Sequence, residues 1–200
     1  MIVIDEKHPG IGGAAIGAIL GYNPHRTAFD AWSEITGRTP RRNDPPSQAA
    51  EWGIALEPVV ASKYAVTNGT VVLGDGSTRY AQGVAAMWVT GRPDRLVAKH
   101  WPAPFNYETS DVREIFSHGL EVKTTSWHRA EEWGASGSSE IPDRVAAQMH
   151  WYMLLTGLPR WDAAVLIGGQ EYRQYTVMAD AKIRDFLLAT AQAWWDKYVV

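Results

Sequence analysis

The pattern of apolar and polar residues predicts helices and strands in mixed order along the chain. Apolar residues recur at helical spacing in three long segments, and two shorter apolar stretches near the start are also typical of helices. The predicted helices cover residues 10–21, 27–36, 48–68, 141–156 and 180–198. Predicted strands cover residues 1–5, 70–73, 80–89, 95–98, 119–125, 163–167 and 171–177. This order indicates an α/β (or α+β) fold with a central mixed sheet flanked by helices.

Glycine, proline and polar clusters mark the connections between these elements. Gly74-Asp75-Gly76-Ser77 predicts a hairpin between the strands on either side of it, and Gly168-Gly169-Gln170 predicts another. Residues 38–47, with three arginines and three prolines, predict a loop with local positive charge. Residues 100–118 predict a polar and aromatic insertion, with His100 and His118 at the surface. Because the chain shows no internal repeat or second-domain boundary, we expect one domain over residues 1–200.

Composition narrows the class of protein without fixing it. A hydrophobic content of 46% over 200 residues is enough for one substantial core, and the net charge of -3 gives no overall basic field for nucleic acid. The lack of cysteine excludes disulfides, thiolate metal sites and a cysteine-ligated iron–sulfur cluster. There is neither an apolar run of transmembrane length nor a signal-peptide pattern, so we expect a cytoplasmic protein without a membrane partner.

The strongest candidate chemistry lies on the strand at residues 119–125. With a period of two, Leu120 and Val122 share one face, and Glu121 and Lys123 share the other. Upstream, Asp94 follows a short apolar run and supplies a second carboxylate. An acid and a base two positions apart on a strand can therefore share a small site with Asp94.

Two carboxylates on adjacent strands can hold a hard cation, and Mg²⁺ is the most plausible one. The ammonium of Lys123 would then orient or deprotonate an attacking water and offset charge on a phosphate. The alternative is a solvated strand face with a local ion pair. Glu57, beside Pro58 in the helix at 48–68, is either a helix residue without a special role or a third acidic ligand.

Two further features are compatible with a phosphate-bearing substrate. The glycine-rich helix start at residues 10–21 either receives a phosphate through its backbone amides, assisted by Lys7 or His8, or packs closely on its neighbours. It is a poor dinucleotide fingerprint, because Pro9 and a charged stretch separate it from the preceding strand. Arg144, Gln148 and Tyr152 recur every four positions, which predicts either a solvated helix face or a surface for a phosphodiester backbone.

The order of these motifs is more specific than any one of them. They are residues 10–21 with Asn23-Pro24, Leu56-Glu57-Pro58, Gly91-Arg92-Pro93-Asp94, Leu120-Glu121-Val122-Lys123-Thr124, Gln148 with Tyr152, and Trp161-Asp162 to Gly169. In this order the chain resembles the YqaJ family of phage-type recombination nucleases. These are relatives of phage lambda exonuclease within the PD-(D/E)XK superfamily, which has a restriction-endonuclease-like core.

The resemblance implies a role for each matching residue. Asp94 and Glu121 would be the metal-binding acids, with the carbonyl oxygen of Val122 as a further ligand, and Lys123 would be the catalytic lysine. Glu57 matches a helical glutamate that faces the metal site. Gln148 and Tyr152 match a helix that supports the active site and touches the substrate strand. Gln148 would thus have a catalytic role, and Tyr152 would bind DNA together with Arg144 on the same helix face.

One departure from the family pattern concerns the amino-terminal motif. The family commonly carries a serine where this chain has Ala14, and an arginine for a terminal phosphate is not obvious. Lys7, His8 and Arg26 are the candidate substitutes.

The resemblance implies a Mg²⁺-dependent deoxyribonuclease, with Mn²⁺ as a substitute. It would digest linear double-stranded DNA from 5' to 3' and leave 5'-phosphate products. The exposed 3' strand would pass to a single-strand annealing protein, and the enzyme would form a ring-shaped homo-oligomer. An endonuclease of the same fold and a catalytically silent DNA-binding subunit are the alternatives.

Overall fold

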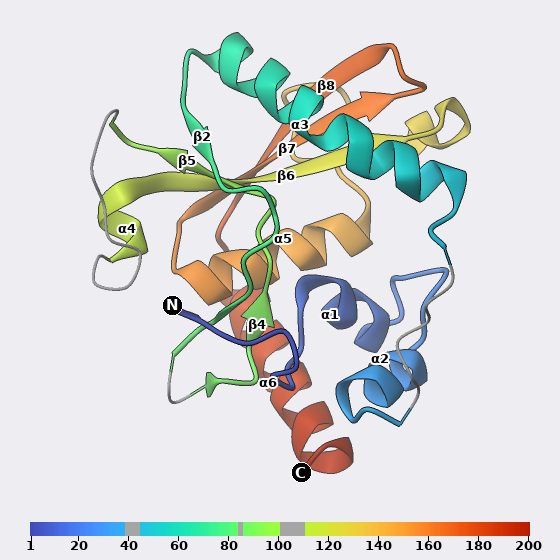
Figure 1. Ribbon diagram of the computed structural model, residues 1–200, viewed down its shortest axis with the longest axis vertical. Helices are drawn as coiled ribbons and strands as arrows, with labels where there is room; N and C mark the ends of the chain where they lie inside the picture. The colour runs from blue at the N-terminus through green and yellow to red at the C-terminus, as the bar shows by residue number, and fades with distance from the viewer. Residues whose placement is uncertain (39–44, 84–85, 101–110) are drawn as a thin grey trace.

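A five-stranded mixed sheet forms the centre of the protein. Figure 1 presents a computed structural model, which describes residues 1–38, 45–83, 86–100 and 111–200. The sheet has the order β2-β5-β6-β7-β8, and only the β6–β7 pair among these neighbours is parallel. Its strands are β2 (Val72–Leu73), β5 (Arg95–Ala98), β6 (Phe116–Thr125), β7 (Arg160–Ile167) and β8 (Glu171–Met178). The predicted central mixed sheet is confirmed.

Helices cover both faces of this sheet. In Figure 1, α3 (Gln48–Asn68) crosses one face, and α5 (Asp143–Thr156) crosses the other. Around α5 lie α1 (Gly13–Ile19) and α6 (Ala181–Tyr198), and α2 (Ala28–Ile35) packs on α1. The short α4 (Val112–Ile115) and the 3₁₀ helix η2 (Trp127–Glu132) lie in connections. Two buried clusters result, a larger one around α5 and a smaller one between α3 and the sheet.

Local sequence signals place several helix ends correctly. The Thr27 side chain caps α2 in a capping box with Asp30, and Gly157 ends α5 in the left-handed conformation, at φ 72°. Gly168 and Gly169, at φ 59° and 75°, form the predicted turn between β7 and β8. These predictions hold because they depend on neighbouring residues alone.

The predicted hairpin at residues 74–77 is wrong. β2 pairs with β5 in the main sheet, whereas the next strand, β3 (Tyr80–Ala81), pairs with β1 (Ile2–Val3) and β4 (Thr90–Gly91) in a separate small sheet. Gly74 and Gly76 both have positive φ, which hairpin turns also require, so these turn residues alone do not decide the partner of β2. Only the first two residues of the strand predicted at 80–89 form a strand, β3, and β4 begins just beyond its predicted end. Residues 84–85 lie outside the described ranges.

Two other predictions need correction. β6 begins at Phe116, so His118 is a buried strand residue with 9% exposure and not a surface residue. Its ring can be buried because both nitrogens have polar partners, Tyr64 and Ser117. The predicted loop at 38–47 and insertion at 100–118 fall partly on residues 39–44 and 101–110, which are outside the described ranges.

The start of α1 lies against α5 and needs a residue without a side chain. A Cβ on Gly13 would lie 2.7 Å from Gln148 Cγ and 2.9 Å from Tyr152 Cζ. The close-packing explanation of the glycine-rich segment therefore holds at this position. We expect Gly13→Ala to lower the free energy of unfolding by about 1–3 kcal/mol, since the buried Tyr152 ring must shift. Urea denaturation measures this.

Gly12 provides the matched control, because a Cβ there meets nothing within 4 Å. Gly12→Ser also keeps a residue suited to the N-cap of α1. Equal urea midpoints for the two variants would show that close packing at Gly13 does not restrict the side chain at this position.

Candidate active site at the edge of β5 and β6

The register of β5 and β6 brings the two predicted acids together. Arg95 pairs with Leu120, so Asp94 lies at the end of β5 beside Glu121 of β6. One oxygen of Asp94, Oδ2, accepts a hydrogen bond of 2.8 Å from the Val122 backbone N–H. Backbone pairing between two strands thus fixes the Asp94 carboxylate next to the second acid.

Glu121 and Lys123 point to the face of the sheet opposite α3. Leu120 and Val122 pack in the cluster beneath α3, so the alternating residues of β6 face the α5 side. Glu121 is fully buried, and its Oε1 accepts a hydrogen bond from the Lys123 ammonium. Its other oxygen, Oε2, is buried without a hydrogen-bond partner among the described residues.

Burial dominates the electrostatics of this pair. Burial and the nearby charge of Asp94 raise the pKa of Glu121 to about 8. Burial alone would lower the pKa of Lys123, but the charges of Glu121 and Asp94 outweigh it and raise that pKa. Lys123 is therefore held as an ammonium beside a carboxyl group that is costly to ionise.

Glu57 reaches the same region from α3. Its Oε1 accepts a hydrogen bond of 2.7 Å from Nη1 of Arg95, which also donates to the Asp94 carbonyl oxygen at 2.5 Å. Burial and the charge of Asp94 raise the pKa of Glu57. Arg95 was not predicted as a site residue. Its only signal in the sequence is a basic residue at the start of an otherwise apolar strand.

The acids at this site are partly bonded to basic side chains. Within the described ranges, no three His, Asp or Glu side chains already form a group that could hold a metal ion. In this structure Glu57 is bonded to Arg95, and Glu121 to Lys123. The unpartnered Glu121 Oε2 nevertheless lies buried beside a second carboxylate, and oxygen ligands of this kind fit Mg²⁺.

Of the three predicted α5 residues, Tyr152 lies near these acids and Gln148 is bonded to Tyr152. Gln148 Nε2 donates to the Tyr152 hydroxyl at 3.2 Å, and the Tyr152 ring packs against Gly13 and Gly91. Burial, together with the charges of Glu121 and Asp94, raises the pKa of Tyr152 well above its usual value. Arg144 is engaged elsewhere, in an ion pair of 2.9 Å with Glu132 of the 3₁₀ helix.

A hollow of about 240 Å³ adjoins Tyr152. The predicted phosphate-binding residues Lys7, His8 and Arg26 all line it, together with the start of α1. Two further arginines line it, Arg79 and Arg92, which sequence reasoning missed. Arg79 donates to the carbonyl oxygens of Glu6 and His8 at 2.8 and 2.6 Å, and thereby braces the loop that carries Lys7.

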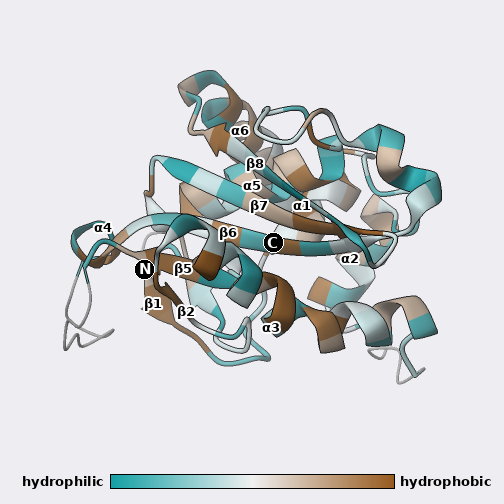
Figure 2. Cartoon of the chain, turned by 90° about the horizontal axis from the view of Figure 1, so that it is seen from above, coloured by the Kyte–Doolittle hydropathy of each residue, from teal (hydrophilic) through white to brown (hydrophobic). Residues whose placement is uncertain are grey.

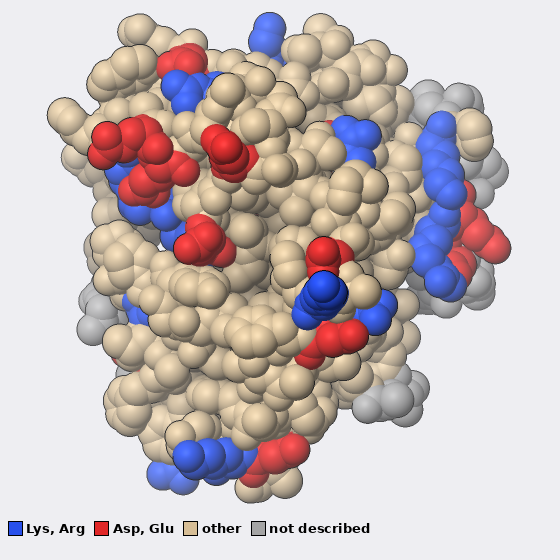
Figure 3. Space-filling model, turned by 180° about the vertical axis from the view of Figure 1, so that it is seen from behind, with Lys and Arg blue, Asp and Glu red and all other residues tan. Residues whose placement is uncertain are grey.

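On the face seen in Figure 3, basic and acidic side chains lie in small mixed groups. No helix among the described residues combines the length and apolar character needed to cross a membrane.

The sheet, its flanking helices and the acids at the β5–β6 edge define a protein with the PD-(D/E)XK restriction-endonuclease-like fold. The family model described as the YqaJ-like viral recombinase domain matches residues 5–159, and the chain belongs to this family.

Comparisons with individual proteins agree with this assignment. The chain is 28% identical over 200 positions to the protein YqaJ of Bacillus subtilis (strain 168), an alignment covering 98% of this chain and 55% of the relative. It therefore spans about half the length of that curated relative.

Two solved structures share the fold at low sequence identity. The alkaline exonuclease LHK-Exo from Laribacter hongkongensis is 13% identical with a TM-score of 0.67, covering 96% of this chain and 89% of its own. A phage-related exonuclease from Haemophilus somnus 129PT is 14% identical with a TM-score of 0.57, covering 95% of both chains.

Proposed function

We propose that this protein is a Mg²⁺-dependent deoxyribonuclease that digests linear double-stranded DNA from 5' to 3' and leaves 5'-phosphate products. The observation that carries this proposal is the buried Glu121 carboxyl group, with one oxygen unpartnered in the described structure, beside Asp94 and Lys123. Membership of the YqaJ-like family and the fold shared with two proteins named as exonucleases support it.

Asp94, Glu121, Glu57 and the carbonyl oxygen of Val122 would hold the ion, with Mn²⁺ as a substitute for Mg²⁺. When bound, the ion supplies a more acidic water and stabilises negative charge on the phosphate. This chain would hold its ligands in place through the Val122 N–H bond to Asp94 and the Arg95 bond to Glu57.

Lys123 contributes the charged donor of the reaction. Its ammonium stands beside Glu121 and can align the attacking water or pair with a phosphate oxygen as charge develops. Gln148 supports this site from α5, and Tyr152, kept neutral by its high pKa, contacts the substrate strand as a hydrogen-bond donor. Arg144 would reach the backbone of DNA only by leaving Glu132.

The hollow beside Tyr152 would receive the terminal 5' phosphate. Lys7, His8 and Arg26 supply donors around it, and the α1 N-terminus contributes to the same wall. Arg26 is paired with Glu34, whose side chain is 47% exposed, so it can exchange that partner for a phosphate at little cost.

We expect Arg26→Met to reduce the preference for 5'-phosphorylated ends by about 10-fold, because a charge-assisted hydrogen bond is lost. Initial digestion rates of matched 5'-phosphate and 5'-hydroxyl duplexes measure this preference. Arg184→Met, which removes an exposed arginine outside the lining of the hollow, is the control. An unchanged preference in the Arg26 variant would remove this residue from the phosphate site.

In the cell, the proposed product is a duplex with an exposed 3' strand. A single-strand annealing protein would take over that strand, and a ring-shaped homo-oligomer would keep the enzyme on DNA. The setting would be the cytoplasm of a bacterial or phage-infected cell.

The proposal is tested with a linear duplex labelled at one 5' end and a closed circular plasmid, each with Mg²⁺ or EDTA. We expect loss of the linear DNA alone, only with Mg²⁺, and only while Lys123 is intact. Cutting of the circle would instead assign an endonuclease. DNA binding without cleavage would assign a catalytically silent subunit.

A further inference from the structure

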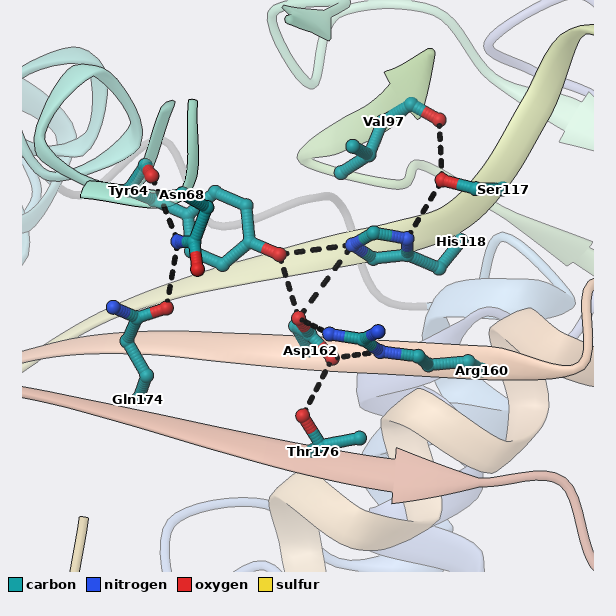
Figure 4. Close-up of polar contacts among 9 residues, drawn as sticks. All are labelled: Tyr64, Asn68, Val97, Ser117, His118, Arg160, Asp162, Gln174 and Thr176. Atoms are coloured by element: carbon teal, nitrogen blue, oxygen red, sulfur yellow. Dashed lines mark hydrogen bonds and ion pairs between the residues drawn. The ribbon is translucent and has the colours of Figure 1, made fainter. Parts of the chain in front are cut away.

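A buried polar cluster joins α3 to the sheet on the face opposite Glu121, beside Leu120. Figure 4 shows Asp162 of β7 at its centre, and this residue is only 3% exposed. The carboxylate accepts hydrogen bonds from the Tyr64 hydroxyl at 2.6 Å, Arg160 Nε at 2.7 Å and Thr176 Oγ1 at 3.0 Å. Both carboxylate oxygens are thus satisfied by side chains from three elements.

Tyr64 is the member of this cluster that belongs to α3. Its hydroxyl also lies 2.8 Å from His118 Nε2, and Ser117 Oγ lies 2.8 Å from the other ring nitrogen of His118 (Figure 4). Since Tyr64 is 1% exposed, its hydroxyl has to find these partners in the protein interior. The position of α3 is therefore tied to β6 and β7 through one buried oxygen.

Glu57 and Tyr64 lie on the same side of α3. They are separated by roughly two helical turns, or about 10 Å along the axis. Glu57 is bonded to Arg95 of β5, and Tyr64 to Asp162 of β7. Val60 and Ala61, between these two anchors, are buried against the sheet. Asn68, one turn further along α3, also donates to Gln174 of β8 at 2.8 Å. Polar contacts thus fix the helix at three points, and one of them is the proposed metal ligand.

Apolar burial alone does not select this side of α3. Trp52, Val59 and Val66 recur every seven positions on an outward side and are 66%, 60% and 78% exposed. Figure 2 shows apolar segments along the helix, in keeping with apolar residues on more than one side of α3. Because this exposed apolar side could also pack on the sheet, apolar burial leaves the rotation of α3 about its own axis undetermined. A polar anchor can select one rotation.

We propose that the Tyr64–Asp162–His118 cluster positions Glu57 for cation binding, which makes Tyr64 a positioning residue of the metal site. A small rotation of α3 at Tyr64 would move Glu57 away from Asp94 and Arg95, because both residues share one rigid helix. This inference rests on the proposed function, in which Glu57 is a ligand of the ion.

The test is Tyr64→Phe, which removes only the hydroxyl. Mn²⁺ is titrated calorimetrically into the DNA-free protein, and the cleavage rate is measured against Mg²⁺ concentration. We expect the Mn²⁺ Kd to rise about 10-fold, as for other residues that orient metal ligands. The cleavage rate at saturating Mg²⁺ should stay within about twofold of the wild type.

Tyr175→Phe is the matched control. Tyr175 is buried, and its hydroxyl donates to the Gly134 carbonyl oxygen at 2.8 Å, away from α3. It loses one buried hydrogen bond, as Tyr64→Phe does, but should leave the Mn²⁺ Kd unchanged. In a Glu57→Gln background, Tyr64→Phe should no longer alter that Kd, because the residue it positions has gone.

If the Tyr64 variant unfolds, Thr176→Val is the replacement test variant, because it removes one hydrogen bond to Asp162 without changing any residue of α3. A rise in Kd for Thr176→Val would then support the inference, and an unchanged Kd would refute it. An unchanged Kd in folded Tyr64→Phe, or an equal rise in Tyr175→Phe, would overturn the inference alone. A wild type that neither binds Mn²⁺ nor cleaves DNA would overturn the proposed function as well.

Discussion

Replacing Lys123 by methionine is expected to lower the rate of DNA cleavage by about 10²- to 10³-fold at saturating Mg²⁺ and DNA. Methionine keeps most of the length of the side chain but removes the ammonium that stands beside Glu121. The loss should fall on the maximal rate, because a donor that acts as charge develops contributes little to binding the ground state. Single-turnover digestion of a labelled linear duplex measures that rate.

Lys63→Met is the control for this experiment, because Lys63 lies exposed on α3. The Lys123 variant should still bind Mn²⁺, since the carboxylates remain in place. A single-turnover rate within about threefold of the wild type would contradict the catalytic role of Lys123.

Glu121→Gln is expected to reduce cleavage by at least about 10²-fold and to change how stability depends on pH in EDTA. In the folded protein, burial and Asp94 raise the pKa of Glu121 from 4.5 to about 8, so folding favours the neutral carboxyl group. That contribution to stability is fully present below about pH 4.5 and is lost as pH rises through about 8. Glutamine cannot ionise, so the variant should lack this loss.

Urea denaturation in EDTA from about pH 5.5 to about pH 8.5 measures the effect. The difference in unfolding free energy between the Glu121 variant and the wild type should shift by at least about 1 kcal/mol in favour of the variant as pH rises. Exposed Glu131→Gln should follow the wild type throughout. Parallel curves for wild type and Glu121→Gln would mean that Glu121 is not held neutral by its surroundings.

The sequence predicted the parts of the fold that depend on local signals. The alternation at residues 119–125 gave the two faces of β6 correctly, because a period of two is visible without knowing the neighbouring strands. The hairpin at 74–77 failed because the partner of β2 is β5, a segment beyond β3 and β4. Local turn signals do not contain that information.

For the candidate site too, local features could be predicted and contacts between distant segments could not. Asp94 and Glu121 could be placed side by side because each follows from a strand assignment, and the register of β5 and β6 agrees. The partners of those acids could not be predicted. Arg95 meets Glu57 only through the packing of α3 on the sheet, and Arg144 is paired with Glu132 of the 3₁₀ helix η2.

His118 illustrates the limit for buried polar residues. By sequence it is a surface residue at the end of the predicted insertion. The structure instead surrounds it with Tyr64 and Ser117 and places it near Asp162, 98 positions beyond Tyr64. A buried polar group is stable only when such partners converge, and their convergence is a property of the fold.

The most direct test of the proposed site compares digestion of one linear duplex with Mg²⁺, with EDTA, and with Mg²⁺ restored after EDTA, for wild type and Asp94→Asn. Asparagine can still accept the Val122 N–H bond, so the fold should be kept while the charge is lost. We predict digestion by the wild type that stops in EDTA and returns with Mg²⁺, and none by the variant. Digestion that continues in EDTA, or proceeds equally in Asp94→Asn, would contradict a metal-dependent nuclease site at Asp94 and Glu121.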